Sequence, residues 1–193
     1  MKKIILTATA ILAVMALTAC GDNAVSSTAK SDTVQSASQS TEQTSENSVI
    51  SLSGNVTATI DKKNSPFDGF STVILRDKVN KTVKFIKADP NSDKTAQDYI
   101  QSKDESDEYY LFDINANTVV HYTFDENKSG IYYTYDLNTD KIVKIEDSEH
   151  KDITQSVSDN SSSNTAADAL KADIETLRTY TNNRYKKSIS ELV

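Results

Sequence analysis

The chain is poor in the residues on which several classes of chemistry depend. Its 193 residues include one Cys, two His, four Gly, two Pro and no Trp. A single Cys cannot form an internal disulfide, and two His are too few for a histidine-rich metal site or a histidine relay. Neither a Walker loop nor a Gly-x-Gly-x-x-Gly loop occurs. We therefore expect no metal and no cofactor.

Basic residues are also in deficit. The chain has 21 Lys and Arg against 28 Asp and Glu, a net charge of −7. Because phosphate binding needs a Lys/Arg surplus on some face, we expect no nucleic-acid partner. His121 lies in an expected strand among apolar neighbours, and His150 lies in a charged run. With no nucleophile elbow and no Ser-x-x-Lys set, the sequence predicts that the protein is not an enzyme.

The first 20 residues have the organisation of a secretory signal. A positive start, Met1 to Lys3, precedes an apolar run of 14 residues from Ile4 to Leu17. This run is shorter than the about 17–25 residues of a membrane-spanning helix, but it suits a signal peptide. The ending Leu17-Thr18-Ala19-Cys20 resembles the lipobox of bacterial lipoproteins.

That resemblance implies a lipid anchor. It implies cleavage between Ala19 and Cys20, removal of residues 1–19 as a signal peptide, and a diacylglyceryl group on the Cys20 thiol. Two acyl chains hold a protein stably at a membrane, so we expect the mature chain at the extracytoplasmic face of the cell membrane. Gly21, and not an Asp, follows the Cys, so the residue that often holds Gram-negative lipoproteins at the inner membrane is absent. The composition, rich in Lys, Asn and Ser, favours a Gram-positive cell. In a Gram-negative cell the outer membrane is the alternative.

The full sequence divides into five expected parts, of which the signal peptide is the first. Residues 21–48 hold twelve Ser and Thr and no aromatic residue, so residues 20–48 read as the lipidated Cys and a flexible tether. Residues 49–150 show the alternation of a β domain. Residues 151–164 read as a polar linker, and residues 165–193 as a C-terminal helix.

Alternating apolar residues place the strands of the β domain. Strands are expected at 56–60, 72–75 and 82–86, followed by a four-strand meander at 109–114, 118–124, 130–136 and 141–145. Residues 95–102 are expected to form one or two helical turns. The motif of residues 109–115 returns at 132–138 and resembles hairpins of β-propeller blades. Two copies cannot close a propeller, so we interpret them as similar hairpins in one sheet.

The C-terminal helix carries an apolar stripe. Thr165 and Asp168 resemble a capping box, and the stripe follows at helical spacing. Its members are Leu170, Ile174, Leu177 and Thr181, extended by Tyr185, Ile189 and Leu192. The predicted fold class is α+β, an antiparallel sheet with this helix packed on it. The alternative is a helix that binds a partner.

Two patterns are candidate binding sites. Tyrosines of the meander could form a ligand face for a peptide or glycan, or they could pair across strands and stabilise the sheet. They are Tyr109, Tyr110, Tyr132, Tyr133 and Tyr135. The second pattern, residues 125–130, has acidic and amide residues at calcium-loop spacing, but strands flank it. We interpret it as a hairpin turn.

These observations favour a non-enzymatic surface binding module. Residues 20–164 contain 14 Lys and Arg and 24 Asp and Glu, a net charge of −10. Such a field attracts cations, so a cationic peptide, as captured by immunity-type lipoproteins, is the first expected ligand. A glycan or protein partner is also open. The alternative is a structural accessory subunit of an envelope complex that grips its partner through the C-terminal helix.

Overall fold

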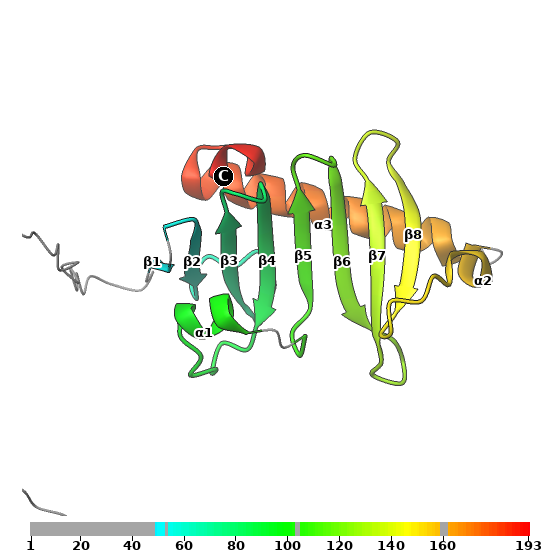
Figure 1. Cartoon of the computed structure of the whole chain (residues 1–193), viewed down its shortest axis with the longest axis horizontal. Helices are drawn as coiled ribbons and strands as arrows, with labels where there is room; N and C mark the ends of the chain where they lie inside the picture. Colours follow the sequence, from blue (N-terminus) through cyan, green and yellow to red (C-terminus); the bar gives the residue numbers. More distant parts are fainter. Residues whose placement is uncertain (1–48, 53, 103–104, 159–161) are drawn as a thin grey trace, which may run out of the picture. The chain divides into compact units, whose positions relative to one another are not determined.

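The computed structural model describes residues 49–52, 54–102, 105–158 and 162–193. Within these ranges, eight strands, three α-helices and a final 3₁₀ turn follow one another (Figure 1). The elements are β1 (Val49–Leu52), β2 (Val56–Asp61), β3 (Ser71–Asp77), β4 (Thr82–Ala88), α1 (Ala96–Gln101), β5 (Tyr109–Asp113), β6 (Thr118–Phe124), β7 (Gly130–Asp136), β8 (Lys141–Asp147), α2 (Thr154–Ser158), α3 (Ser162–Tyr185) and η1 (Ile189–Leu192).

The eight strands form one antiparallel sheet in the order of the sequence, β1 to β8, so every neighbour is a hairpin or meander partner. Helix α3 crosses behind the sheet from β8 towards β2, and α1 lies in front of the other face near β2 (Figure 1). The predicted fold class, an antiparallel α+β meander with a C-terminal helix packed on it, is confirmed.

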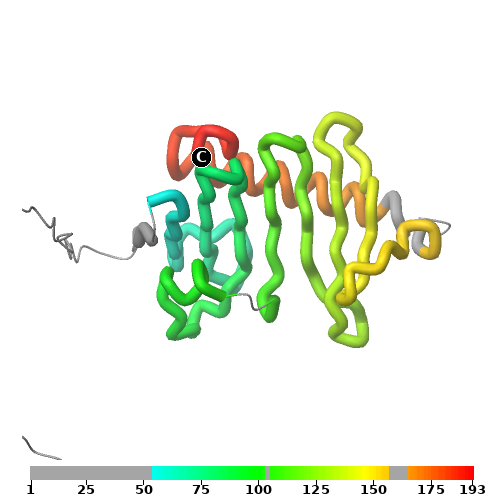
Figure 2. The backbone as a smooth tube through the Cα atoms, in the orientation of Figure 1, coloured from blue at the N-terminus to red at the C-terminus, as the bar shows by residue number. Residues whose placement is uncertain are grey.

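Three hairpins share one kind of turn, and these turns lie at the same end of the sheet (Figure 2). The turns after β3, β5 and β7 begin with an Asp whose side chain accepts a backbone N–H of the turn, as from Ala116 N to Asp113 Oδ1 at 2.9 Å. The fifth residue of each turn has a left-handed backbone that reverses the chain: Lys81, Asn117 and Asp140, with φ of 55°, 53° and 55°. The repeat in the sequence is therefore a repeated hairpin in one sheet.

The apolar stripe of α3 forms one side of the main core. Leu170, Ile174 and Leu177 are at most 3% exposed, and Thr181 is fully buried. They join sheet residues that point to the same side: Ile74, Val83, Phe85, Tyr110, Phe112, Val119 and Tyr135. Burial of each Leu or Ile side chain contributes about 1.5–3 kcal/mol, so docking on the sheet stabilises a helix of modest intrinsic propensity.

The ends of α3 differ from the sequence expectation. The helix begins at Ser162, so Thr165 lies inside its first turn and is not its N-cap. It runs through the asparagines at 182 and 183 to Tyr185. Lys186 then adopts a left-handed backbone, φ 55°, and donates its N–H to the Asn182 carbonyl. That geometry ends the helix and turns the chain back towards the sheet.

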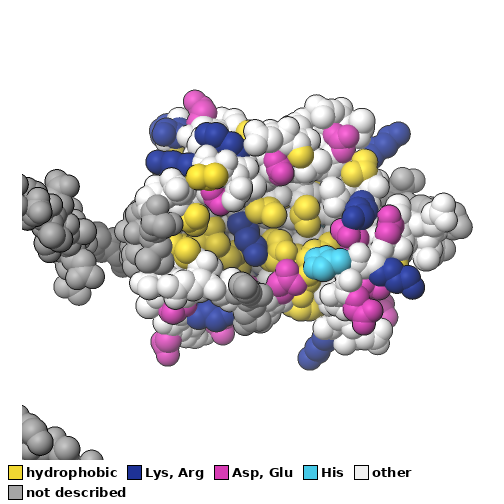
Figure 3. Space-filling model, viewed as in Figure 1, with side chains coloured by type: hydrophobic (Ala, Val, Ile, Leu, Met, Phe, Trp, Pro, Cys, Tyr) yellow, Lys and Arg dark blue, Asp and Glu magenta, His cyan; other side chains and the backbone are white. Residues whose placement is uncertain are grey.

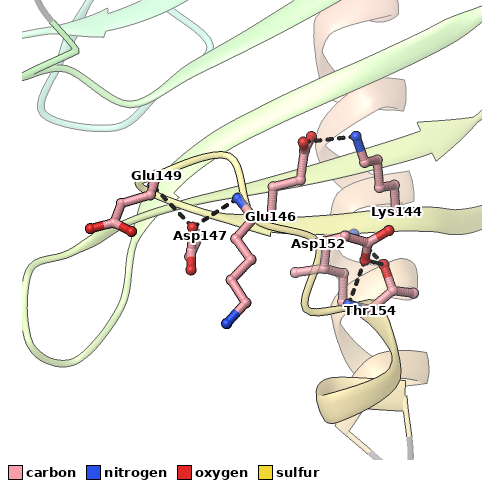
Figure 4. Close-up of polar contacts among 8 residues, drawn as sticks. Lys144, Glu146, Asp147, Glu149, Asp152 and Thr154 are labelled. Carbon is pink, nitrogen blue, oxygen red and sulfur yellow. Dashed lines mark hydrogen bonds and ion pairs between the residues drawn. The ribbon is translucent and has the colours of Figure 1, made fainter.

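The stretch expected as a polar linker contains α2 and covers the lower part of the β8 edge (Figure 4). The Ile145 N–H donates to Thr154 Oγ1 at 2.9 Å, and the Ile145 carbonyl accepts from Ile153. Thr154 is fixed in turn by Asp152, whose carboxylate accepts its N–H and its hydroxyl. Further up, β8 bulges between its pairings with Thr134 and Tyr135. Both features limit edge-to-edge pairing with another sheet.

Candidate functional site

The two faces of the sheet differ in what covers them. Helix α3 packs against one face of the sheet, which we call the closed face. On the other face, a second apolar cluster lies against α1 and the segment before β5. Its buried members are Val73, Ile86, Ala88, Tyr99, Tyr109, Tyr122 and Tyr132. We call this side the open face, because its upper half carries apolar side chains that none of the described helices covers (Figure 3).

One row of cross-strand neighbours defines the exposed part of the open face. In register from β3 to β8 it contains Leu75, Lys84, Leu111, Val120, Thr134 and Lys144. Leu75, Leu111 and Val120 are only partly buried, against the second cluster. Figure 3 shows hydrophobic surface gathered over the middle of this face. We call the part of this row from Leu75 to Val120 the apolar strip.

A row of four aromatic rings in contact lies below the strip. Tyr109 and Tyr122 are stacked with ring centroids 5.1 Å apart. Tyr122 and Tyr132 are tilted at 4.8 Å, and Tyr132 and His150 are tilted at 4.6 Å. The hydroxyls of Tyr109 and Tyr132 both donate to the Glu105 carboxylate. Burial, with Glu105 nearby, raises the pKa of both phenols. The three tyrosines are at most 7% exposed and thus form the floor of this face.

Lys84 lies within the strip as an amphipathic cation. Its ammonium is 3.5 Å from the centroid of the Tyr109 ring, a cation–π contact. Burial lowers the pKa of Lys84, while the carboxylates of Glu105 and Asp107 oppose that shift. The stem of Lys84 therefore extends the apolar surface between Leu75 and Leu111.

Carboxylates border the strip along both sides. Below it lie Glu105, Asp107 and Glu146, of which Asp107 pairs with Lys94 at 3.3 Å and Glu146 with Lys144 at 2.7 Å. The next row above it, about 7 Å further along the strands, holds the turn aspartates of β3, β5 and β7. These are Asp77, Asp113 and Asp136. An apolar strip between two acidic borders is the charge pattern of this face.

The closed face contains a polar network at one end of the sheet. His121 Nε2 and Glu108 Oε1 are 2.9 Å apart, and Lys87 Nζ donates to the same carboxylate at 2.8 Å. Burial raises the pKa of Glu108, but the hydrogen bonds from His121 and Lys87 outweigh it and bring the value to about 2. The Tyr110 hydroxyl donates to Asp173 of α3 at 2.8 Å. Each of these polar side chains has a hydrogen-bond partner within the network. The hydrogen bond from Tyr110 to Asp173 links the sheet to α3.

The five tyrosines expected as a possible ligand face do not share one face. Tyr110, Tyr133 and Tyr135 lie on the closed face, while Tyr109 and Tyr132 lie on the open face. All except Tyr133 are buried. Their contacts are those of cross-strand packing, the alternative stated for them.

The acidic turn at residues 125–130 has the contacts of a hairpin turn. Asp125 Oδ1 accepts the backbone N–H groups of Asn127 and Ser129, each at 2.8 Å. Lys128 adopts the left-handed backbone, φ 62°. Among the described residues, no group of three or more His, Cys, Asp or Glu side chains is placed to hold a metal ion.

Sequence reasoning missed the apolar strip. Its signal was present: in β5 both faces are apolar, because Tyr109 and Leu111 alternate with Tyr110 and Phe112. A solvated antiparallel sheet normally alternates apolar and polar residues, so a strand that is apolar on both sides indicates two covered faces or a binding surface. The pattern could not say which side α3 would occupy.

The anchoring motif, Leu17, Thr18, Ala19 and Cys20, lies outside the residues that the structure describes, as does the expected tether. Within the described ranges, no helix combines the length and the hydropathy that crossing a bilayer requires. A scan against protein-family models, a search of curated proteins and a search of solved structures each found no match.

Proposed function

We propose that the mature chain is a lipid-anchored, extracytoplasmic binding module that captures a cationic, amphipathic peptide on the open face of its sheet. The observation that carries the proposal is the partly buried apolar strip between two borders of carboxylates. An apolar patch rimmed by polar groups is typical of an interaction surface.

The strip has the dimensions of a short peptide segment. From Leu75 to Val120 it crosses three strand spacings, about 14 Å. That length corresponds to about four residues of extended peptide, or between two and three turns of an amphipathic helix. Apolar side chains of such a segment would lie against Leu75, Leu111 and Val120.

The charges favour a cationic partner. The chain up to α3 has a net charge of −10 after cleavage, which would raise the rate of encounter with cations and make it fall with salt. Lys and Arg side chains of a bound peptide would reach Glu105 on one side of the strip and Asp77 or Asp136 on the other. Glu105 and Asp107 also offset the charge of Lys84.

Binding of a peptide of alternating Leu and Lys, followed by calorimetry, tests the proposal. Leu111→Ser removes apolar contact area at the centre of the strip and is expected to weaken binding about tenfold or more. Val79→Ser is the matched control, because Val79 is 65% exposed in the β3–β4 turn. Equal affinities for both variants, or equal binding of a Leu and Glu peptide, would contradict the proposal.

The anchor is tested separately. Intact-mass spectrometry of the membrane fraction should give a chain that begins at Cys20 and carries a diacylglyceryl group, and a Cys20→Ala variant should lack both. An uncleaved or unlipidated mass would refute the anchoring and leave the peptide site to stand alone.

The accessory-subunit alternative has less support. It requires an apolar surface on the C-terminal helix, but the stripe of α3 is packed against the sheet. The residues that α3 exposes between 170 and 185 are mostly polar or charged, among them Lys171, Glu175 and Thr179.

A further inference from the structure

A hollow of about 600 Å³ lies at the end of α3, away from the apolar strip. Its walls come from the ends of β5 and α3, from the turns after β5 and β7, and from the chain that turns back after Tyr185. A volume of this size is in the range of small-molecule sites. The hollow shares only Asp113 with the acidic border of the proposed peptide surface, and binding in the hollow does not depend on peptide capture.

One wall of the hollow is apolar. Ile114 comes from the turn after β5, Leu137 from the turn after β7, and Ile189 from η1. Ile189 is 6% exposed, because η1 packs against the main core. The capping box of η1 fixes this segment: Glu191 accepts the N–H and the hydroxyl of Ser188, each at 2.7 Å. The apolar wall is thus held in place by the fold.

Another part of the lining is basic, in a chain that has more acidic than basic residues. Arg178, Lys186 and Lys187 form it. Two carboxylates also line the hollow: Asp113 accepts from Ala116 N at 2.9 Å, and Glu191 accepts from Ser188 and interacts electrostatically with Lys187. Three cations against two carboxylates leave one positive charge in excess (3 − 2 = 1). Arg178 is paired with Glu175, an exposed pair whose contribution is small and which can open.

We infer that this hollow binds a small organic anion with an apolar body, such as an aryl or medium-chain carboxylate. The apolar body lies against Ile114, Leu137 and Ile189, and the anionic head is held by Lys186, Lys187 and Arg178. The proposed peptide site on the open face uses none of these six residues.

Three probes with one ring system and different charge test the inference. The mature chain, residues 20–193 with Cys20→Ser, is titrated with 2-naphthoate, 2-naphthalenemethanol and 2-naphthylmethylammonium, and backbone amide shifts are followed by NMR. We expect saturable binding of 2-naphthoate in the about millimolar range, with shifts at residues 113–117 and 186–191. The alcohol should bind about tenfold more weakly, and the ammonium should not saturate.

Matched variants separate the site from non-specific attraction. Lys187→Gln should weaken 2-naphthoate about fivefold or more, and Lys187→Arg should retain it. Lys151→Gln removes an exposed cation in the turn after β8 and should have no effect. The inference is overturned if the alcohol binds as well as the acid, if the shifts lie elsewhere, or if Lys187→Gln behaves like Lys151→Gln.

Discussion

Replacing Leu177 by Ala should destabilise the protein by about 3 kcal/mol. Leu177 is fully buried in the core between α3 and the sheet. The change removes three buried carbons and leaves a cavity, and such substitutions cost about 2.7–5 kcal/mol when the surroundings relax only in part. Because domains of this size are stable by about 5–15 kcal/mol, the loss is a large share of the total.

Urea denaturation followed by circular dichroism measures this loss. The midpoint should fall without a change in the slope, and the melting temperature should fall by roughly 6–12 °C. Thr179→Ala is the matched control on the exposed side of the same helix and should stay within about 0.5 kcal/mol of the parent. If Leu177→Ala and Thr179→Ala were equally mild, α3 would not be docked on the sheet in solution.

Three further predictions concern polar contacts and packing. The pKa of Glu108 is about 2 in the folded protein and 4.5 ordinarily. The ionised Glu108 therefore contributes fully to the free energy of unfolding above pH 4.5, and this contribution is lost as the pH falls towards 2. Glu108→Gln should flatten the acid branch of a curve of stability against pH. Asp61→Ala should cost about 2–4 kcal/mol in urea denaturation, since it leaves the buried Tyr180 hydroxyl without its 3.0 Å acceptor, whereas a cost below about 0.5 kcal/mol would refute that role. Gly130→Ala should lower the melting temperature, because a Cβ there would lie 2.6 Å from the Tyr122 ring; an unchanged value would show that the ring can shift.

The arrangement of the sheet followed from local patterns. Alternation of apolar residues predicted strands at 118–124 and 130–136, and the structure has both strands with these bounds. The spacing of Leu170, Ile174 and Leu177 likewise identified the buried side of α3. These signals are reliable because each is set by the period of its own element.

Features that depend on contacts between distant elements could not be read in this way. The sequence does not show that Asp173 of α3 meets Tyr110 of β5, or that Tyr180 meets Asp61 across 119 positions. Nor does it show which side of β5 the helix covers, so the tyrosines were a more visible candidate surface than Leu111. The hollow at the end of α3 required the left-handed turn at Lys186, a conformation that Lys adopts rarely.

The central claim is that the open face, and not the closed one, is the binding surface. Methyl NMR during titration with the Leu and Lys peptide tests it most directly. The account predicts saturable shifts at the methyl groups of Leu75, Leu111 and Val120, with little change at Leu177 under α3. Shifts confined to α3 and the closed face, or none at the strip when the peptide is bound, would contradict it.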